Sequence, residues 1–468
     1  MSAPRRVAVI GGGISGLAAA HRLVERGRES GQPLEVRLFE AGPRAGGVIR
    51  TERSDGFVIE AGPDSFLSEK PAALRLCERL GITDRLVGTR EEFRRTYVVR
   101  DGCLRALPDG FLLMAPTRLW PLVTTPLFSW PGKLRMALDL VLPRGSGADE
   151  SLADFVTRRL GREALERVAQ PLVGGIYTAD PQRLGLAATM PRFLEMERSA
   201  RSIILAMCRQ QRAAAQRSAG SGARWSLFLS FDGGLQCLVD ELVRHLPDST
   251  VQLERPIRAL ERLADGAWRL DGAFECDSVV VATPAHAAAA LLRPLDATLG
   301  GELDAIHYAS SATVTLAFRR EEIPHPLDGF GFVVPHAEHR ALLAGTFSNL
   351  KYPGRAPAEW LLVRAFIGGA LQPELVELDD EALTAAVRRE LETLIGVRAA
   401  PHLIRIARWR RAMPQYQVGH LERVARIRAR AAALGVHLAG NGYEGVGIPD
   451  CIRSGESAAE ATLADLPV

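Results

Sequence analysis

The stretch Val7–Glu40, VAVIGGGISGLAAAHRLVERGRESGQPLEVRLFE, decides how the N-terminal part of this chain folds. Residues 7–10 form a short apolar run that predicts a strand, and residues 14–26 carry apolar side chains at helical spacing, which predicts a helix that ends near Gly27. Residues 34–40 alternate in polarity and predict a second strand. A β-turn-α-β pattern of about forty residues has the size of one mononucleotide-binding unit.

The turn between the first strand and the helix has the pattern GxGxxG, formed by Gly11, Gly13 and Gly16. The first glycine permits a tight turn, the second lets the backbone approach a pyrophosphate, and the third lets helix and strand pack closely. The pyrophosphate is expected at the helix N-terminus, where free N–H groups and the helix dipole favour an anion. The predicted contacts in this turn are Gly11, Gly12, Gly13, Ile14, Ser15 and Gly16.

Glu40 ends the second strand, 24 residues after Gly16, close to the offset of about 20 expected for a ribose-binding acid. A carboxylate there accepts hydrogen bonds from ribose hydroxyls and repels a 2′-phosphate, which disfavours NADP. The following Arg44-Ala-Gly46-Gly47 is similar to the Arg-x-Gly-Gly signature of flavin amine-oxidase-type enzymes. Arg44 is expected to pair with the pyrophosphate, and the glycines admit close backbone approach. The cofactor is therefore predicted to be FAD.

A second glycine-rich turn follows a strand at 436–439, in Leu438–Gly455, LAGNGYEGVGIPDCIRSG. Main chain is expected to approach the flavin edge here, and the N-terminus of the following helix to stabilise negative charge on the reduced flavin. Many flavoproteins carry an acid after the first glycine, where this chain has Asn441.

Nucleotide-fold strands at the start, near residues 277–282 and at 436–439 predict an α/β, Rossmann-type domain assembled from separate segments, in a chain that is α+β overall. The expected FAD-binding domain covers 1–90, 222–300 and 425–468, with a linker at Gly220–Gly222. An inserted helical domain is expected over 91–221 and a substrate-binding domain with a mixed β-sheet over 301–424. A helix is also predicted over 71–87.

Composition excludes several classes of protein. The net charge of +3 argues against a dedicated nucleic-acid binder, and six scattered cysteines without a CxxC pair indicate reduced thiols and a cytoplasmic location. The first strand begins near Arg5, which leaves no room for a signal peptide. No apolar run predicts a membrane-spanning helix. Leu119–Trp130 either lines a pocket or core or dips into a membrane surface; Pro121 and Pro126 favour the pocket or core.

Six stretches in order along the chain resemble the protoporphyrinogen oxidases and, more closely, the bacterial branch that oxidises coproporphyrinogen III. They are Glu60–Leu67, Gln170–Tyr177, Phe231–Gln236, Gly329–Pro335, Pro414–His420 and Gly440–Gly447. The resemblance implies non-covalent FAD, three domains, and a helical domain that faces the membrane in some members. It also implies removal of six electrons from a porphyrinogen in three flavin cycles, with electrons passed to O₂ to give hydrogen peroxide.

Carried over by position, the resemblance adds further cofactor and substrate residues. The cofactor residues are the 11–16 turn, Glu40, Ala41, Arg44, Gly47, Gly62, Pro63, Asp64, Ser65, Ile257 (through its main chain), Trp409, Val446, Gly447 and Ile448. The substrate residues are Thr96, Gly175, Val333 and Tyr352. Thr96 is a departure, because the protoporphyrinogen-specific branch has an arginine there that pairs with a propionate. With Arg94, Arg95 and Arg100 nearby, coproporphyrinogen, which has four propionates, is the favoured substrate, and protoporphyrinogen IX, which has two, is the alternative that stays open.

The residues indicate no protein catalytic group and no metal site, since no Ser–His–acid grouping, metal-ligand cluster or paired carboxylate stands out. His286, His307 and His420 are interpreted as structural or surface residues. We expect hydride removal from a meso carbon to flavin N5, then tautomerisation. The alternatives are a flavin amine oxidase or carotenoid-type desaturase, and a non-catalytic flavin or porphyrin carrier. Peripheral membrane contact, transient contact with the next haem-pathway enzyme and the oligomeric state are left open.

Overall fold

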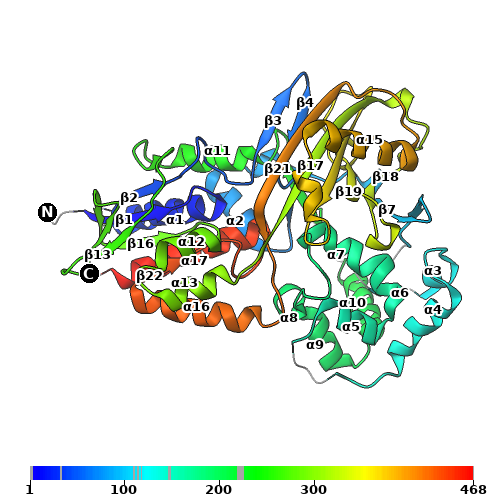
Figure 1. Ribbon diagram of the computed structural model, residues 1–468, viewed down its shortest axis with the longest axis horizontal. Coiled ribbons are helices and arrows are strands. Elements are labelled where there is room, and N and C mark those ends of the chain that lie inside the picture. The colour runs from blue at the N-terminus through cyan, green and yellow to red at the C-terminus, as the bar shows by residue number, and fades with distance from the viewer. Residues whose placement is uncertain are drawn as a thin grey trace.

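The computed structural model describes residues 4–31, 34–108, 111–112, 115–116, 119–145, 149–218 and 226–466. Within these ranges the chain forms a parallel sheet covered by helices, a large mixed sheet, and a cluster of helices (Figure 1). The parallel sheet lies at one end of the molecule, and the mixed sheet and the helical cluster lie side by side at the other. The expected linker at 220–222 lies outside the described residues.

The parallel sheet is built from three separate parts of the chain, as the sequence predicts. Its five strands lie in the order β12 (Val251–Gln252), β2 (Leu34–Phe39), β1 (Arg5–Ile10), β16 (Ser278–Val281) and β22 (Val436–Leu438). All four pairings are parallel. The central strands read as continuous apolar runs because both faces of the sheet are covered.

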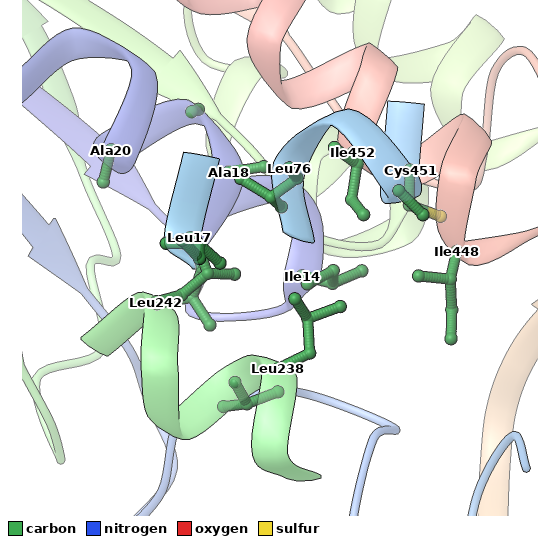
Figure 2. Close-up of a cluster of buried hydrophobic side chains, with 14 of the residues drawn as sticks. Ile14, Leu17, Ala18, Ala20, Leu76, Leu238, Leu242, Ile448, Cys451 and Ile452 are labelled. Atoms are coloured by element: carbon green, nitrogen blue, oxygen red, sulfur yellow. The ribbon is translucent and has the colours of Figure 1, made fainter. Parts of the chain in front are cut away.

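One face of this sheet packs against helices α1 (Ile14–Ser30), α2 (Pro71–Leu80), α11 (Gln236–His245) and α17 (Ile448–Asp465). Figure 2 shows the apolar cluster between them, in which Leu17, Leu76, Leu238 and Ile452 converge. The opposite face packs against helices α12 (Ala285–Leu292), α13 (Ala297–Asp304) and α16 (His420–Leu434) and strands β13 (Leu260–Arg262), β14 (Trp268–Leu270) and β15 (Phe274–Cys276).

The mixed sheet has seven strands and joins distant parts of the chain. Their order is β21 (Leu403–Pro414), β17 (Tyr308–Arg319), β20 (Trp360–Gly368), β19 (Leu342–Phe347), β18 (Gly329–Val333), β7 (Arg95–Arg100) and β8 (Cys103–Ala106). Helix α15 (Asp380–Ile395) contributes to the core on one face of the sheet. Because β7 pairs with β18, residues 95–106 join this sheet, although the sequence assigned them to the helical domain that begins at 91.

Short strands connect these layers. Hairpin β3 (Thr51–Ser54) and β4 (Phe57–Glu60) leads from the nucleotide unit into the loop 61–65. Beyond that loop, β5 (Phe66–Leu67), β11 (Phe228–Phe231) and β6 (Leu86–Gly88) form a three-stranded sheet. The division of the chain into three domains stays a prediction.

The helical cluster has its own apolar core. Its helices are α3 (Leu119–Thr124), α4 (Trp130–Ala137), α5 (Leu152–Arg159), α6 (Arg162–Ala164), α7 (Gln170–Tyr177), α8 (Leu186–Thr189), α9 (Pro191–Ala200) and α10 (Ile203–Ser218). The segment 119–130 divides between the two expected environments. Leu122, Leu127 and Phe128 are buried in the core, whereas Trp120 and Trp130 are 74% and 65% exposed.

Two helix ends differ from the sequence prediction. Helix α1 continues past Gly27 to Ser30, and the left-handed residue that ends it is Gly31, at φ +66°. A glycine inside a helix costs only about 1 kcal/mol, so tertiary packing retains it. Helix α2 ends at Leu80, not at 87, because Gly81 adopts a left-handed conformation and Leu86–Gly88 pair with β11 as a strand.

Candidate cofactor and substrate site

The turn after β1 has the geometry of an anion cradle. Gly11 has φ +108°, and a Cβ there would lie 2.8 Å from the Ala282 carbonyl oxygen. A Cβ on Gly16 would lie 1.9 Å from the Gly11 oxygen, so helix and turn require glycine at both positions. Gly13 faces open space, and α1 begins after it without a side-chain cap, which leaves helix N–H groups free for a phosphate. The side chain of Ile14 lies in the core (Figure 2), and Ser15 is buried.

Glu40 lies directly beside this turn. Its carboxylate accepts hydrogen bonds from the amides of Gly12, at 2.6 Å, and Gly42, at 2.7 Å. The amide of Arg255 donates to the Glu40 carbonyl at 2.8 Å, which brings the segment with half-buried Ile257 next to the same strand end. Ala41 is exposed. The structure therefore groups the predicted adenosine-side residues around one carboxylate.

Arg44 holds its own loop in place. Its guanidinium donates to the carbonyl oxygens of Ala45, at 3.1 Å, Ile49, at 2.9 Å, and Gly47. The Gly46 amide in turn donates to the Gly12 carbonyl at 2.7 Å, and Gly47 packs on Gly13. Arg44 thus shapes a loop that lies over the glycine turn, while its pairing with a pyrophosphate stays a prediction.

The second glycine turn precedes α17, which also begins without a side-chain cap, at Gly447. Val446 and Gly447 are partly exposed, whereas the side chain of Ile448 points into the core (Figure 2). Helices α1 and α17 cross very closely, because a Cβ on Gly455 would lie 2.1 Å from the Ser15 carbonyl oxygen. Two helices with uncapped N-termini therefore pack directly on each other.

Thr283 is a candidate cofactor residue that the sequence reasoning missed. It follows β16 and lies between the two glycine turns: its amide nitrogen is 3.2 Å from a Cβ built on Gly11, and its carbonyl oxygen is 3.8 Å from one built on Gly440. Its hydroxyl is buried and has no hydrogen-bond partner among the described residues. A polar group at the carboxyl end of a parallel strand, left unpaired, fits a cofactor at this edge of the sheet. The signal that the sequence offered for Thr283 was its position directly after a predicted buried strand.

The loop 61–65 connects the parallel sheet to the mixed sheet. The Ala61 carbonyl accepts hydrogen bonds from Trp409 Nε1, at 2.8 Å, and from the Thr313 hydroxyl, at 3.0 Å. The Gly62 carbonyl accepts one from Arg364, and a Cβ on Gly62 would lie 1.7 Å from the Val48 oxygen. The predicted cofactor residues 62–65 and Trp409 are thus brought together, from strands far apart in the sequence.

Charged side chains surround Asp64 in this loop. Its carboxylate lies 2.9 Å from Lys351 Nζ and 3.9 Å from the Arg364 guanidinium, and it accepts a hydrogen bond from Ser65 at 2.7 Å. Pro63 is partly exposed. Burial alone would raise the pKa of Asp64, but Lys351 and Arg364 outweigh it, so the pKa lies well below its usual range. Asp64 is therefore a permanently ionised group at neutral pH.

A second carboxylate in the same region behaves differently. Burial raises the pKa of Glu60, although Arg355 lies 3.7 Å away and the Thr51 hydroxyl and Leu235 amide donate to it. Tyr352, which is 1% exposed, packs beside Arg355 and Lys351. The predicted substrate residue Tyr352 therefore belongs to the charged cluster around the loop 61–65.

The other predicted substrate residues meet on one face of the mixed sheet. Thr96 is paired with Gly331, and Val98 with Val333, and alternate strand residues share a face. Val98 and Val333 pack into the helical core, so Thr96 also faces the helical cluster. Helix α7 contacts β18 there, and its Gly175 is exposed with open space beside it. The structure brings Thr96, Val333 and the helix of Gly175 to one interface.

No group of three or more His, Cys, Asp or Glu side chains in the described ranges is placed to hold a metal ion. Helices in these ranges are also too short or too polar to cross a membrane.

An open Gly13, two uncapped helices and an unpaired Thr283 hydroxyl fit a dinucleotide cofactor.

Comparison with known proteins gives the family. Residues 14–463 match the family of flavin containing amine oxidoreductases. The coproporphyrinogen III oxidase of Bacillus subtilis (strain 168) is 37% identical over 98% of each chain, and the human protoporphyrinogen oxidase is 32% identical over 99% of each chain. A crystal structure from an Exiguobacterium species, provisionally named a protoporphyrinogen oxidase, is 33% identical, with a TM-score of 0.87 over 100% of both chains. The chain therefore belongs to the flavin-containing amine oxidoreductases, in the family of the porphyrinogen oxidases, and its cofactor is FAD.

Proposed function

We propose that this protein oxidises a porphyrinogen to a porphyrin in haem biosynthesis, with coproporphyrinogen III as the favoured substrate and O₂ as the final electron acceptor. The observation that carries the proposal is the junction where the loop 61–65 meets the mixed sheet, next to the face with Thr96 and Val333. It joins predicted cofactor residues to predicted substrate residues. Relatives from Bacillus subtilis, Propionibacterium freudenreichii and Staphylococcus aureus, which are 37%, 36% and 30% identical, carry the name coproporphyrinogen III oxidase, which supports the substrate choice.

In this proposal the protein binds and orients, and the cofactor carries the redox chemistry. Bound FAD supplies a two-electron acceptor, which no side chain provides. The uncapped start of α1 holds the pyrophosphate, Glu40 holds the ribose, and the start of α17 favours negative charge at the ring. Trp409 and Arg364 fix the loop 61–65 through its carbonyl oxygens.

The substrate preference rests on the position of Thr96. Arginines lie nearby, but each is engaged: Arg95 pairs with Asp328, Arg94 lies 3.3 Å from Glu91, and Arg100 donates to the Pro126 carbonyl. Arg94 and Arg100 keep 54% and 23% of their side-chain surface exposed, and Arg100 shares a strand face with Thr96, so both are accessible to substrate propionates, whereas Arg95 points to the opposite face. We therefore assign propionate recognition to partly exposed arginines at the edge of the site.

The experiment is growth of porphyrin fluorescence when the FAD-loaded protein meets coproporphyrinogen III or protoporphyrinogen IX in air, each against a blank without enzyme. Hydrogen peroxide is measured in parallel, and three molecules per porphyrin are expected. Faster growth with coproporphyrinogen supports the proposal. No growth above the blank with either substrate, combined with flavin reduction by amines or polyenes, would establish the amine-oxidase or desaturase alternative.

Gly175 offers a test of the substrate face. A Cβ at this position meets nothing within 4 Å and Gly175 is exposed, so the side chain of Gly175→Trp begins in open space. We expect porphyrin formation to be abolished while FAD remains bound, and Gly175→Ala to keep most of the activity. Full turnover by the tryptophan variant would show that the substrate lies elsewhere.

An apolar patch on the helical cluster supports peripheral membrane contact. It consists of exposed side chains on α3, α4 and the turn after them: Trp120, Val123, Trp130, Leu134, Leu138 and Val141. Lys133 Nζ lies 4.6 Å from the centre of the Trp130 ring, a basic group beside amphipathic tryptophan. Sedimentation with anionic vesicles is expected to carry the protein down, and Trp120→Ser with Trp130→Ser to release it. If vesicles do not bind, this patch is assigned instead to contact with the next enzyme of the haem pathway.

A further inference from the structure

Lysine is rare in this chain, and its position at 351 is unusual. The chain has 58 basic residues besides histidine, and only Lys70, Lys133 and Lys351 are lysines. The side chain of Lys351 is 16% exposed. Arginine is larger and planar, with a forked set of donors, whereas lysine ends in a compact ammonium group. A largely enclosed lysine in a chain with so many arginines indicates a space that fits an ammonium group better than the larger guanidinium group.

The surroundings of Lys351 define that space. Its ammonium nitrogen lies 2.9 and 3.1 Å from the two carboxylate oxygens of Asp64. It also lies 5.3 Å from the centre of the Tyr352 ring and 5.7 Å from that of Phe228. The Lys351 carbonyl accepts a hydrogen bond from the Arg90 amide at 3.0 Å, which fixes the main chain. One carboxylate and two aromatic rings thus hold a single cation.

Asp64 in turn connects this cation to the loop 61–65. The Arg364 guanidinium lies 3.9 Å from the same carboxylate and also donates to the Gly62 carbonyl. The remaining charged groups around the cluster are Glu60 and Arg355, which lie 3.7 Å apart. Of the two cations on Asp64, Lys351 is the nearer one and the one that also contacts Tyr352.

We propose that Lys351 is a positioning residue: its ion pair with the Asp64 carboxylate holds the loop 61–65 against the flavin and connects that loop to Tyr352. The inference rests on the proposed placement of the flavin beside this loop. Lys351 touches neither flavin nor substrate in this account and acts through Asp64. Its removal leaves a largely enclosed carboxylate with the more distant Arg364 as the remaining cation within 4 Å among the described residues.

The positioning role predicts a change of FAD affinity with pH that a purely structural contact would not produce. Burial raises the pKa of Asp64, and Lys351 and Arg364 lower it. Without Lys351 the burial effect is less opposed, so the carboxyl group takes up a proton at a higher pH. Tyr352, Glu60 and Arg355 remain in place around it and do not supply the missing cation. FAD binding by such a variant should therefore weaken as the pH falls, in a range where the wild type is unaffected.

The test is the FAD dissociation constant of the holoenzyme between pH 4.5 and 8, measured by flavin fluorescence in equilibrium dialysis. Lys351→Met is expected to raise Kd about tenfold at pH 7.5, the loss of one charged hydrogen bond, and to show an acid limb, a further rise of Kd as the pH falls toward 4.5, that the wild type does not show in this range. Lys133→Met is the matched control, since it removes a lysine that lies over Trp130 on the helical cluster, and it should leave Kd unchanged.

Two further variants separate charge from general damage. Lys351→Met combined with Asp64→Asn removes both charges of the pair and mimics protonated Asp64, so its Kd should be independent of pH and equal to the Kd that Lys351→Met approaches at the acid end of the range. Lys351→Arg keeps the charge and should keep the wild-type pH dependence even if the larger head group weakens binding. A wild-type Kd and pH dependence in Lys351→Met would overturn the proposal, as would an identical pH dependence in the single and double variants. A wild type that binds FAD but oxidises neither porphyrinogen defeats the proposed function alone, because the Kd measurements still decide the role of Lys351.

Discussion

The crossing of α1 and α17 gives the sharpest prediction of stability. A Cβ at residue 455 would lie 2.1 Å from the Ser15 carbonyl oxygen, and contacts under 3.0 Å are essentially never observed. Gly455→Ala must therefore separate the two helices by roughly 1 Å, and overpacking of this kind in a close-packed interior costs about 3 kcal/mol. Because both helix N-termini belong to the proposed FAD site, FAD affinity should fall together with stability.

Gly301→Ala is the matched control, since it lies in helix α13, is exposed, and a Cβ there meets nothing within 4 Å. Replacing a helical glycine by alanine at such a position should stabilise the protein by up to about 1 kcal/mol. Urea denaturation of both variants, read by circular dichroism, measures the difference in the free energy of unfolding. Equal stability of the two variants would refute the inferred helix contact.

Three other predictions concern single buried groups. Thr283→Val keeps the shape of the side chain and removes an unpaired hydroxyl, so FAD affinity should fall in a fluorescence titration while the melting temperature of the FAD-free protein is unchanged or rises. Asp139→Asn should lower the free energy of unfolding by about 3–5 kcal/mol in urea, because Asp139 and Arg159 form a fully buried ion pair 2.5 Å apart; an unchanged denaturation midpoint would contradict this. Burial lowers the pKa of His21 to about 4, so between pH 6.5 and 4 the unfolded chain binds a proton that the folded chain does not. The free energy of unfolding should therefore decline by up to about 3 kcal/mol as the pH falls through that window. The decline should be shallower in His21→Leu.

The nucleotide unit was predictable from sequence because its signals are local. Gly11, Gly16 and Glu40 are separated by a fixed strand, turn and helix, and their required geometry follows from short-range sterics and the spacing of the elements. The assembly of one sheet from three distant segments was also predictable, since each segment ends in its own turn signal.

Non-local contacts were not predictable in the same way. The carbonyl partners of Arg44 depend on how its loop folds back, and the pairing of β7 with β18 joins residues more than two hundred positions apart. Thr283 became a candidate only when its hydroxyl was found buried and unpaired. The residues around Asp64 come from three parts of the chain, so their spacing in the sequence does not indicate that they lie close together.

The arrangement of the parallel sheet bears on the order in which the protein is made. Strand β1 is paired on one side with β16, and β16 with β22, which ends at Leu438. Helix α17, which packs on α1, follows only after that. As the ribosome releases the chain from its N-terminus, β1 meets β2 (Leu34–Phe39) early, but β16 (Ser278–Val281) follows much later, and β22 and α17 come last, after residue 435. Such long-range pairing slows folding and exposes strand edges meanwhile. We therefore expect the cofactor site to be completed only after α17 has been synthesised, so that FAD binds after synthesis.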